Sequence, residues 1–578
     1  MIEGKSRVTL QVNKVDSHLI YARWVAGVCF FIHFIFSLIG WNHSLLDHHG
    51  NRQSFTALTA YYFVKDGVRF DYETPAWGVP WSCPVELPVY QGIVALIDRT
   101  TGWGIDQTGR GVSLFFFYAM LLVLYRLVIA LCASRSCAWL AIAFCLASPV
   151  YLFWSKTFLQ ETTALFFSVL YLWGIAESHK NKGLFWVLLA MSAGILASTT
   201  KITTFVLALF LGTMMCLIWF FQRGKDKFYV PTLLKAGLMA VFYGLIPMAA
   251  ALKWTSFADS LKAQNALAAT LTSKMMMGWN FGSLHQRIFG QFHHIPVLVL
   301  FLGLIGIFVF LLFLAKGVRP YFAIFFFTFF LGPMVFTNLF IAHTYYWVEN
   351  TVYLYLALAF VCYILMTNSF WAPWLRSLLI PVFLISMVGI TAVRYLPGQM
   401  HDTGAYFVAS ARSVQEYVPP GGVLLVYGFG IDPSFPYYAQ RKAIMVGDAA
   451  ITDDAVVRTI DLTGPKNIKA LVVGPDTNRS EEYFKNVADR FHLTKEIYLA
   501  EGQGMITQYD MEKYSFDWND VSAKLVKYGW ASRINLVEIR LNAGYDADKG
   551  RMAKVFGANF PGIYHMLQES HHFKCFVR

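Results

Sequence analysis

Charged side chains are scarce in this chain of 578 residues, of which only 14% are Asp, Glu, Lys or Arg. Soluble domains use roughly 25%, whereas 56% of this chain is hydrophobic and 17% is aromatic. This balance excludes an ordinary soluble domain and indicates a polytopic membrane protein. The formal net charge of +12 fits Lys and Arg held in cytoplasmic loops, beside anionic headgroups, better than it fits a nucleic-acid partner.

Motifs for metals and nucleotides are also missing. The sequence has no CxxC and no HExxH, and the GFG turn at residues 428–430 lacks the rest of a GxGxxG fingerprint. The histidines between residues 285 and 294 cluster without the fixed spacing of a zinc site. No cofactor is therefore expected, and a divalent metal has no support. Of the eight cysteines, only Cys83 and Cys575 fall in polar segments, and whether they pair is left open.

Eleven apolar runs predict about eleven membrane spans. They are Trp24 to Gly40, Val112 to Leu131, Ala138 to Phe153, Thr162 to Ala176, Phe185 to Ala197, Phe205 to Phe221, Ala236 to Leu252, Pro296 to Ala315, Tyr321 to Ile341, Val352 to Met366 and Leu378 to Val393. The first is preceded by basic residues and lacks a cleavage site, so the N-terminus is expected in the cytoplasm. This count places the short basic loops in the cytoplasm and every long polar segment outside it, as the positive-inside rule requires.

The hydropathy divides the chain into two parts. Residues 1–394 are expected to form the membrane module, with a long first extracytoplasmic loop at 41–111. Residues 395–578 carry short β-rich runs, VLLVYG, AIMVG, ALVVG and MITQY, with the helix-like EEYFKNVADRF before the last. The expected fold class is thus a polytopic α-helical membrane protein with a C-terminal soluble α/β domain outside the cytoplasm.

The first polar loop holds a carboxylate close to the membrane surface, Asp47, followed by His48, His49, Arg52 and Gln53. A carboxylate there is suited to act as a base, although a lone loop acid is more often simply solvated. The stretch FTALTAYYFVKDG predicts an amphipathic helix lying at the interface, with its aromatic residues at 61–63 in the headgroups.

The second half of this loop, PAWGVPWSCPVELPVYQ, sets Trp77 and Trp81 around one acid, Glu86. Stacking on Trp suits a sugar or a lipid headgroup. The alternative is a packed loop in which Glu86 pairs with Arg52.

Three further turns carry polar residues beside apolar runs. They are SKTFLQET with Lys156 and Glu161, STTK with Lys201, and IAHTYYWVEN with His343, Tyr345, Tyr346 and Glu349. Lysines at span ends often only snorkel to the headgroups, and tyrosines there often form the aromatic belt. Glu161 fits snorkelling less well, because an acid that opens an apolar helix indicates a cavity or a cap. His343, together with Glu349, fits the aromatic belt less well.

These features together resemble the GT-C superfamily of integral-membrane glycosyltransferases, in the branch of protein mannosyltransferases and aminoarabinose lipid A transferases. The likeness is carried by residues 47–52, PWSCPVELPVYQ, FWSKTFLQETTALFF, STTKITTF and NLFIAHTYYW, within the first two thirds of the chain. Members often have two adjacent acids in the first loop, whereas here two histidines follow Asp47.

The resemblance implies transfer of a sugar from a polyprenyl-phosphate donor to an acceptor glycan, lipid or protein outside the cytoplasm, with inversion at the anomeric carbon. It implies Asp47 as the catalytic base, and Arg52, Lys201 and Arg287 as ligands of the donor phosphate. It also implies substrate binding by His48, His49, Trp81, Glu86, Glu161, His343, Tyr345 and Tyr346. The expected location is a bacterial inner membrane.

Two other classes remain open. A transporter or flippase of lipid-linked sugars also needs such a bundle, but usually places its polar chemistry at mid-membrane. An envelope polysaccharide polymerase or ligase works on the same face with similar donors.

Overall fold

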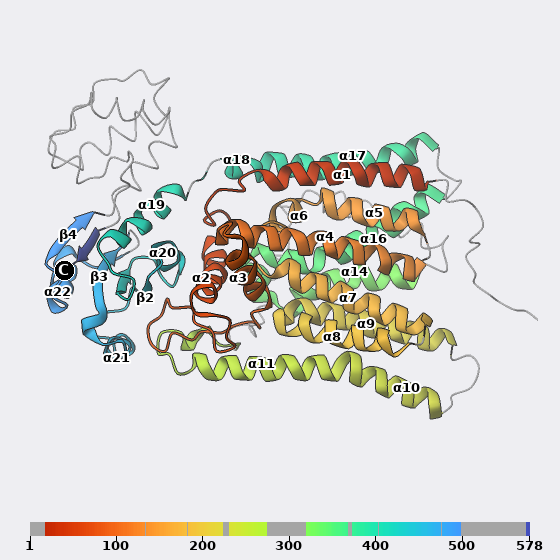
Figure 1. The fold of residues 1–578 in the computed structure, drawn as a ribbon. Coiled ribbons are helices and arrows are strands. Elements are labelled where there is room, and N and C mark those ends of the chain that lie inside the picture. The colour runs from red at the N-terminus through yellow and green to blue at the C-terminus, as the bar shows by residue number, and fades with distance from the viewer. Residues whose placement is uncertain are drawn as a thin grey trace, which may run out of the picture.

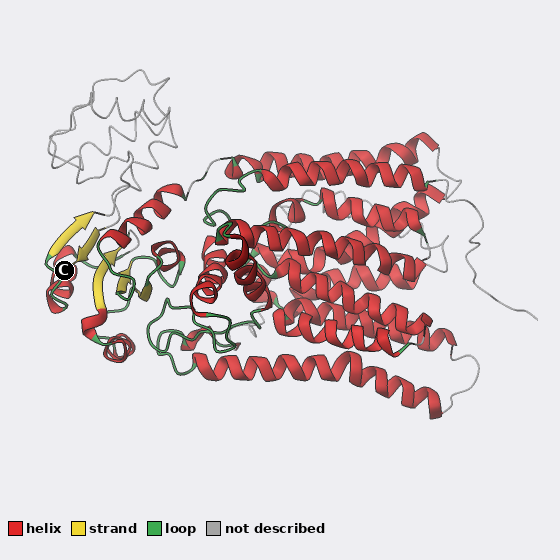
Figure 2. Cartoon of the chain, in the orientation of Figure 1, coloured by secondary structure: helices red, strands yellow, loops and turns green. Residues whose placement is uncertain are grey.

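The computed structural model describes residues 18–132, 134–181, 183–223, 230–273, 319–367, 373–400, 402, 404–474, 477–498 and 574–577. A bundle of long helices occupies one end of the molecule, a small sheet with short helices occupies the other, and two helices of the first polar loop lie between them (Figures 1 and 2). The predicted run Pro296 to Ala315 and the histidines at 285–294 fall outside the described residues.

The bundle is built from apolar helices. They are α1 (Leu19–Leu38), α4 (Ile105–Cys132), α5 (Arg135–Ala147), α6 (Pro149–Trp154), α7 (Glu161–Asn181), α8 (Leu184–Thr200), α9 (Ile202–Arg223), α10 (Val230–Ala240), a π turn η1 (Val241–Leu245), α11 (Ile246–Lys262), α14 (Arg319–Val335), α15 (Thr337–Ala342), a 3-10 turn η4 (Thr344–Tyr346), α16 (Trp347–Thr367) and α17 (Pro373–Arg394). Among the described residues, five helices are long and apolar enough to cross a membrane, and four more apolar helices are shorter. The chain is an integral membrane protein, as predicted, whereas the count of eleven spans remains a prediction.

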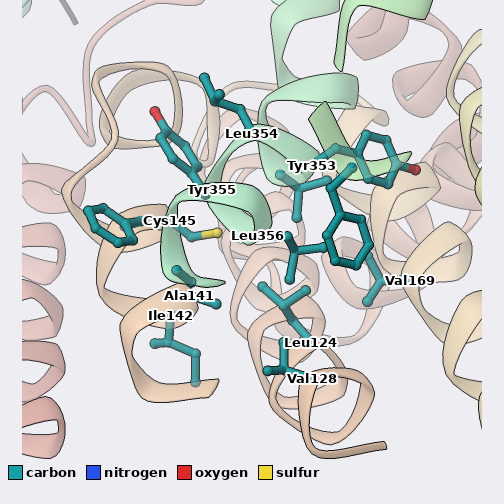
Figure 3. Close-up of a cluster of buried hydrophobic side chains, with 14 of the residues drawn as sticks. Leu124, Val128, Ala141, Ile142, Cys145, Val169, Tyr353, Leu354, Tyr355 and Leu356 are labelled. Atoms are coloured by element: carbon teal, nitrogen blue, oxygen red, sulfur yellow. The ribbon is translucent and has the colours of Figure 1, made fainter. Parts of the chain in front are cut away.

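The core of the bundle surrounds α16. Helices α14, α5 and α7 pack against it, and Figure 3 shows Leu124, Cys145 and Val169 beside the run Tyr353–Leu356. Nearly every residue of α16 is buried, which is why its sequence is apolar on all sides rather than on one stripe.

The first polar loop contains two helices, α2 (Gly50–Asp66) and α3 (Val89–Thr101). The prediction that α2 lies at the interface with its aromatics in the headgroups is wrong for two of them, because Tyr62 and Phe63 are only 3% and 2% exposed. Helix α2 packs against α3 and against α20 (Ser434–Ala439) of the C-terminal unit. It is therefore buried between protein layers.

The C-terminal unit contains a five-stranded sheet in the order β2-β1-β3-β5-β4. The strands are β1 (Val423–Tyr427), β2 (Lys442–Gly447), β3 (Ile468–Val473), β4 (Lys495–Tyr498) and β5 (Lys574–Val577). The helices beside them are α18 (Leu396–Gln399), α19 (Ala405–Ser413), α20, α21 (Asp454–Thr463) and α22 (Glu481–Arg490). Strands β1, β2 and β3 are parallel, and β5 runs antiparallel to both β3 and β4.

Three of the predicted strand runs form β1, β2 and β3, and the predicted helix forms α22. The nearly continuous burial of β1, β2 and β3 fits parallel strands that are covered on both faces. The fourth run, MITQY, falls outside the described residues. The division of the chain at residue 394 remains a prediction.

The first polar loop also extends this sheet. Ala443 and Met445 of β2 donate backbone hydrogen bonds to the carbonyls of Pro75 and Ala76, at 3.0 and 2.8 Å, and Gly78 donates back to Ala443 at 3.1 Å. The loop thus pairs with the edge strand, which would otherwise expose unpaired backbone groups. Cys83 and Cys575 are both buried and free, so they do not pair.

The side-chain amide of Asn265, just after the end of α11, anchors the same loop. The Asn265 side chain donates to the carbonyls of Trp77, Gly78 and Pro80 at 3.2, 3.0 and 2.9 Å. Its oxygen accepts from the backbone amides of Leu267 and Ala268. The loop is therefore tied both to the bundle and to the sheet.

Candidate active site

A buried ion-pair group joins three helices of the bundle. Lys201, between α8 and α9, places its Nζ 2.6 Å from Glu161 Oε1 of α7 and 2.7 Å from Glu349 Oε1 of α16. The three side chains are 5%, 2% and 0% exposed. Charges this deeply buried are stable only when paired. We call these three residues the lysine centre.

Aromatic rings and hydroxyls surround the lysine centre. The ammonium of Lys201 lies 4.1 Å from the ring centroid of Tyr346 and 5.0 Å from that of Tyr345, and Thr203 donates to Glu349 at 2.9 Å. Several buried polar atoms nearby have no hydrogen-bond partner among the described residues: the Oε2 atoms of Glu161 and Glu349 and the hydroxyls of Thr162, Thr163, Thr200 and Thr204. Such groups normally require a partner such as ordered water or a ligand.

A second ion pair lies nearer the surface. Arg52, in the first turn of α2, forms a close ion pair with Glu86, and the two side chains are 17% and 13% exposed. Burial opposes the charge on Arg52, but the neighbouring Glu86 together with Tyr345, Glu161 and Tyr346 outweighs it and raises the pKa of the guanidinium above its ordinary value. Tyr72 fixes the segment that carries Glu86, since its hydroxyl donates to the Glu86 carbonyl at 3.0 Å. Either reading of Glu86 from sequence, as a partner of Arg52 or as a binding group, is compatible with this position.

Asp47 is held by the next turn of the same loop. Gln53 donates through Nε2 to Asp47 Oδ1 at 2.5 Å and accepts from the amide of Phe158 at 2.9 Å. The buried surroundings raise the pKa of the Asp47 carboxyl, and Arg110 and the bond from Gln53 partly offset this rise. Asp47 itself is partly exposed, so an outside group can reach it.

Two cations that sequence reasoning did not select lie near Asp47. Lys156 is 1% exposed and donates to the carbonyls of Phe36, at 2.8 Å, and Ile39, so the snorkelling interpretation is wrong for it. Burial lowers the pKa of Lys156 to about 7, with a further decrease from Arg110. Arg110 is likewise buried, and its Nε has no partner among the described residues.

A narrow pocket opens beside Asp47. Its lining comes from the first loop, from Arg110 and from the segment that leads into the C-terminal unit: Ile39, Gly40, His43, Ser44, Asp47, Arg110, Gly398, Gln399 and Asp402. The space left by these side chains fits about one water molecule. The pocket can therefore admit a hydroxyl group, but not a whole sugar ring, in this conformation.

Histidines and aromatics connect Asp47 to the lysine centre. His49 lies 3.2 Å from Thr344 Oγ1, and its ring centroid is 5.2 Å from that of Tyr345, 5.4 Å from that of His343 and 5.8 Å from that of Trp154. Burial lowers the pKa of His343 to about 4, with further decreases from His49 and the nearby cations. Burial also lowers the pKa of His49. Both rings are therefore neutral near pH 7.

Most of the predicted site residues come together here. The connected group comprises Asp47, His48, His49, Arg52, Glu86, Glu161, Lys201, His343, Tyr345 and Tyr346. Trp81 lies elsewhere: its ring contacts the ammonium of Lys442, which pairs with Glu73 at the edge of the sheet. Arg287 falls outside the described residues.

Sequence reasoning missed Arg110, Trp154 and Thr203, and noted Lys156 and Glu349 without selecting them. The signal for Glu349 was present, because an acid in the first turn of an apolar helix requires a partner. The role of Arg110 carried no such signal. Within the part of the chain that the structure describes, no group of three His, Cys, Asp or Glu side chains could hold a metal ion.

Comparison with known proteins bears on the fold of the chain that carries this site. No family model matches the chain, nor does the sequence of any curated protein. Its fold is shared with solved structures of two membrane enzymes, in agreement with the resemblance seen in the sequence.

Two solved structures carry this likeness. ArnT from Cupriavidus metallidurans, bound to undecaprenyl phosphate, is 13% identical with a TM-score of 0.52, over 83% of this chain and 96% of ArnT. The oligosaccharyltransferase of Archaeoglobus fulgidus in its apo form is 9% identical with a TM-score of 0.53, over 95% of this chain and 88% of that one. At these identities the likeness establishes the fold alone.

Proposed function

We propose that this protein transfers a sugar from a polyprenyl-phosphate-linked donor to an acceptor hydroxyl, with inversion at the anomeric carbon. One observation carries the proposal: a reachable carboxylate, Asp47, shares an aromatic-lined site with two cations, Arg52 and Lys201. The GT-C fold supports it, since one structure with that fold contains undecaprenyl phosphate.

In the proposed reaction Asp47 acts as general base. It takes the proton of the acceptor hydroxyl while the hydroxyl oxygen attacks the anomeric carbon from the face opposite the phosphate. The new glycosidic bond forms as the bond between the anomeric carbon and the phosphate oxygen breaks, and the bonding electrons leave with the polyprenyl phosphate. The raised pKa of Asp47 makes it a stronger base than an ordinary solvated carboxylate.

The leaving phosphate is a stable anion, so it needs positive charge rather than a general acid. Arg52 is the more accessible cation, because it is partly exposed and has one carboxylate partner, Glu86. The donor phosphate would compete with Glu86 for Arg52. Lys201 would act at longer range or after losing one of its two carboxylates, and a role for Arg287 remains a prediction.

The proposed substrates meet at the end of the bundle that faces α2, α3 and the C-terminal unit. We place this end outside the cytoplasm, in a bacterial inner membrane, on the basis of the basic loops in the sequence. His48, His49, His343 and the two tyrosines at 345–346 would line the donor sugar, because imidazole and phenol groups form hydrogen bonds with hydroxyls.

The test is a turnover assay with the purified protein in detergent. A panel of undecaprenyl-phosphate monosaccharides is supplied with candidate acceptors, and transfer of the sugar to an acceptor is followed. Asp47→Asn should lower turnover at least 10²-fold, the low end for loss of a general base, while the affinity for undecaprenyl phosphate is retained. The matched control is Asp66→Asn, an exposed acid in the same loop, at the C-terminal end of α2. Full turnover by Asp47→Asn would refute the proposal.

A transporter of lipid-linked sugars is the second candidate, and the lysine centre favours it. Buried ionisable groups inside a helical bundle often mark a translocation path. The two functions separate in one experiment, because a transporter reconstituted in vesicles moves the lipid-linked sugar across the bilayer without breaking its bond to phosphate.

A further inference from the structure

The main chain just before Asp47 is held by side chains from α4 and from the C-terminal side of the chain. Arg110 of α4 donates through Nη2 to the carbonyls of His43 and Ser44, at 3.2 and 2.9 Å. The remaining contacts come from the C-terminal side of the chain: Asp402, in the segment that follows α18, and Tyr438, in α20.

Asp402 accepts two hydrogen bonds from the same residue. The Ser44 amide donates to Asp402 Oδ2 at 2.8 Å, and the Ser44 hydroxyl donates to Asp402 Oδ1 at 2.6 Å. The amide of Gly404 also donates to Oδ1, at 3.1 Å, which orients the carboxylate. Asp402 thus fixes both the backbone and the side chain of Ser44.

Tyr438 holds the next residue. The amide of Leu45 donates to the Tyr438 hydroxyl at 2.7 Å, and this contact is fully buried. Helix α20 is itself fixed against α4, because the hydroxyl of the neighbouring Tyr437 donates to Asp106 in the first turn of α4. A shift of α20 would therefore be transmitted to Leu45, two residues before Asp47.

The fit between these two segments is close. A Cβ at Gly404 would lie 2.3 Å from Ser44 Oγ and 2.6 Å from Leu46 Cβ, so only glycine is accommodated there. The C-terminal segment also forms one wall of the pocket beside Asp47, through Gly398, Gln399 and Asp402. Both observations place the C-terminal unit directly against the segment that carries the proposed base.

We propose that Asp402 and Tyr438 are positioning residues that hold residues 44 and 45 so that Asp47 faces the acceptor pocket. This proposal rests on the proposed function. It assigns to the C-terminal unit a part in completing the catalytic site, rather than a separate activity. Because a small misplacement of a reacting group can cost about 10²-fold in rate, the three hydrogen bonds that Asp402 and Tyr438 accept from residues 44 and 45 are sufficient to matter.

The experiment compares Tyr438→Phe and Asp402→Asn with a control in the same unit. Tyr427→Phe is the control, since Tyr427 is an equally buried tyrosine whose hydroxyl contacts Tyr483 and not the first loop. Each variant is assayed for kcat, for the affinity of undecaprenyl phosphate and for hydrogen exchange at the amides of residues 44 and 45.

Tyr438→Phe should lower kcat about fivefold to tenfold, as expected for one lost hydrogen bond, and Asp402→Asn by at least as much. The affinity for undecaprenyl phosphate should stay within about twofold, and Tyr427→Phe should leave kcat unchanged. Faster exchange at residues 44 and 45 should accompany the decrease in kcat in both variants.

Two outcomes would overturn the proposal. The first is normal kcat in Tyr438→Phe and Asp402→Asn despite faster exchange at residues 44 and 45. The second is an equal decrease in all three variants, which would indicate general destabilisation. Turnover retained in Asp47→Asn would instead refute the proposed function itself. Because that test uses a different variant, failure of the function can be told apart from failure of the positioning role.

Discussion

Arg52 and Lys201, two of the three cations predicted to bind the donor phosphate, lie in different settings. Arg52 is partly exposed and faces one carboxylate, Glu86. Lys201 is buried and faces two carboxylates that are themselves almost inaccessible. An exchange of partners is therefore much easier for Arg52, because only one ion pair near solvent must open.

This difference in burial gives the two cations different expected effects on donor binding and on the stability of the fold. An ion pair near the surface contributes little to folding, typically up to about 1 kcal/mol. Removing one partner from a buried group leaves a charge without compensation and costs several kcal/mol. We therefore expect Arg52 and Glu86 to control donor affinity, and the lysine centre to control the integrity of the bundle.

The largest expected effect is that of Lys201→Met on stability. This change leaves Glu161 and Glu349 buried without a cation, and should lower the free energy of unfolding by about 3–5 kcal/mol. The measurement is denaturant or thermal unfolding of the detergent-solubilised protein. Arg52→Met is the matched comparison and should cost less than Lys201→Met, because the Arg52–Glu86 pair keeps some contact with solvent.

A compensated variant tests the cause. Combining Lys201→Met with Glu161→Gln and Glu349→Gln removes all three charges, so most of the lost stability should return. If the triple variant were as unstable as Lys201→Met alone, lost packing rather than an unpaired charge would explain the effect.

The next effect concerns donor affinity at the partly exposed Arg52–Glu86 pair. Arg52→Gln should weaken binding of undecaprenyl phosphate about tenfold, since a hydrogen bond to a charged group contributes about 1.5–3 kcal/mol. Glu86→Gln should instead strengthen binding severalfold, because it removes the anion that competes for Arg52. Binding can be measured by titration with undecaprenyl phosphate in detergent. Opposite signs for the two variants are the key result, and weaker binding in Glu86→Gln would contradict competition.

Much of the architecture was predictable from local patterns. Apolar runs predicted ten helical regions that the structure describes, and three β-rich runs predicted β1, β2 and β3. These predictions succeed because hydrophobic periodicity is a property of each segment alone. The position of α2 was not predictable in this way, since its burial depends on α20, which lies some 380 residues later in the chain.

The site shows the same limit. The sequence marked Asp47, Arg52 and Lys201 by residue type and by their places beside apolar runs. It could not indicate that Lys156 is buried against the end of α1, or that Trp81 faces Lys442 at the sheet. These facts depend on long-range packing, which no local pattern encodes.

The smallest expected effect is a pH dependence from His343, whose pKa both cations lower. Its pKa is lowered from 6.5 to about 4 by burial, His49, Arg52 and Lys201, while Glu161 raises it. Between pH 6.5 and 4 the unfolded chain binds a proton that the folded chain does not, so stability should decrease as the pH falls through this window.

This loss should be on the order of 1 kcal/mol, because His343 is partly open to solvent and screening reduces the shift. Unfolding measured at pH 7 and at pH 4 should show a smaller difference for His343→Gln than for the original chain. The exposed His492→Asn is the control, since Asn tolerates the left-handed backbone at that position. An unchanged difference in His343→Gln would mean that the cations do not hold this ring neutral, and that Arg52 and Lys201 are electrostatically more separate from the aromatic group than the geometry indicates.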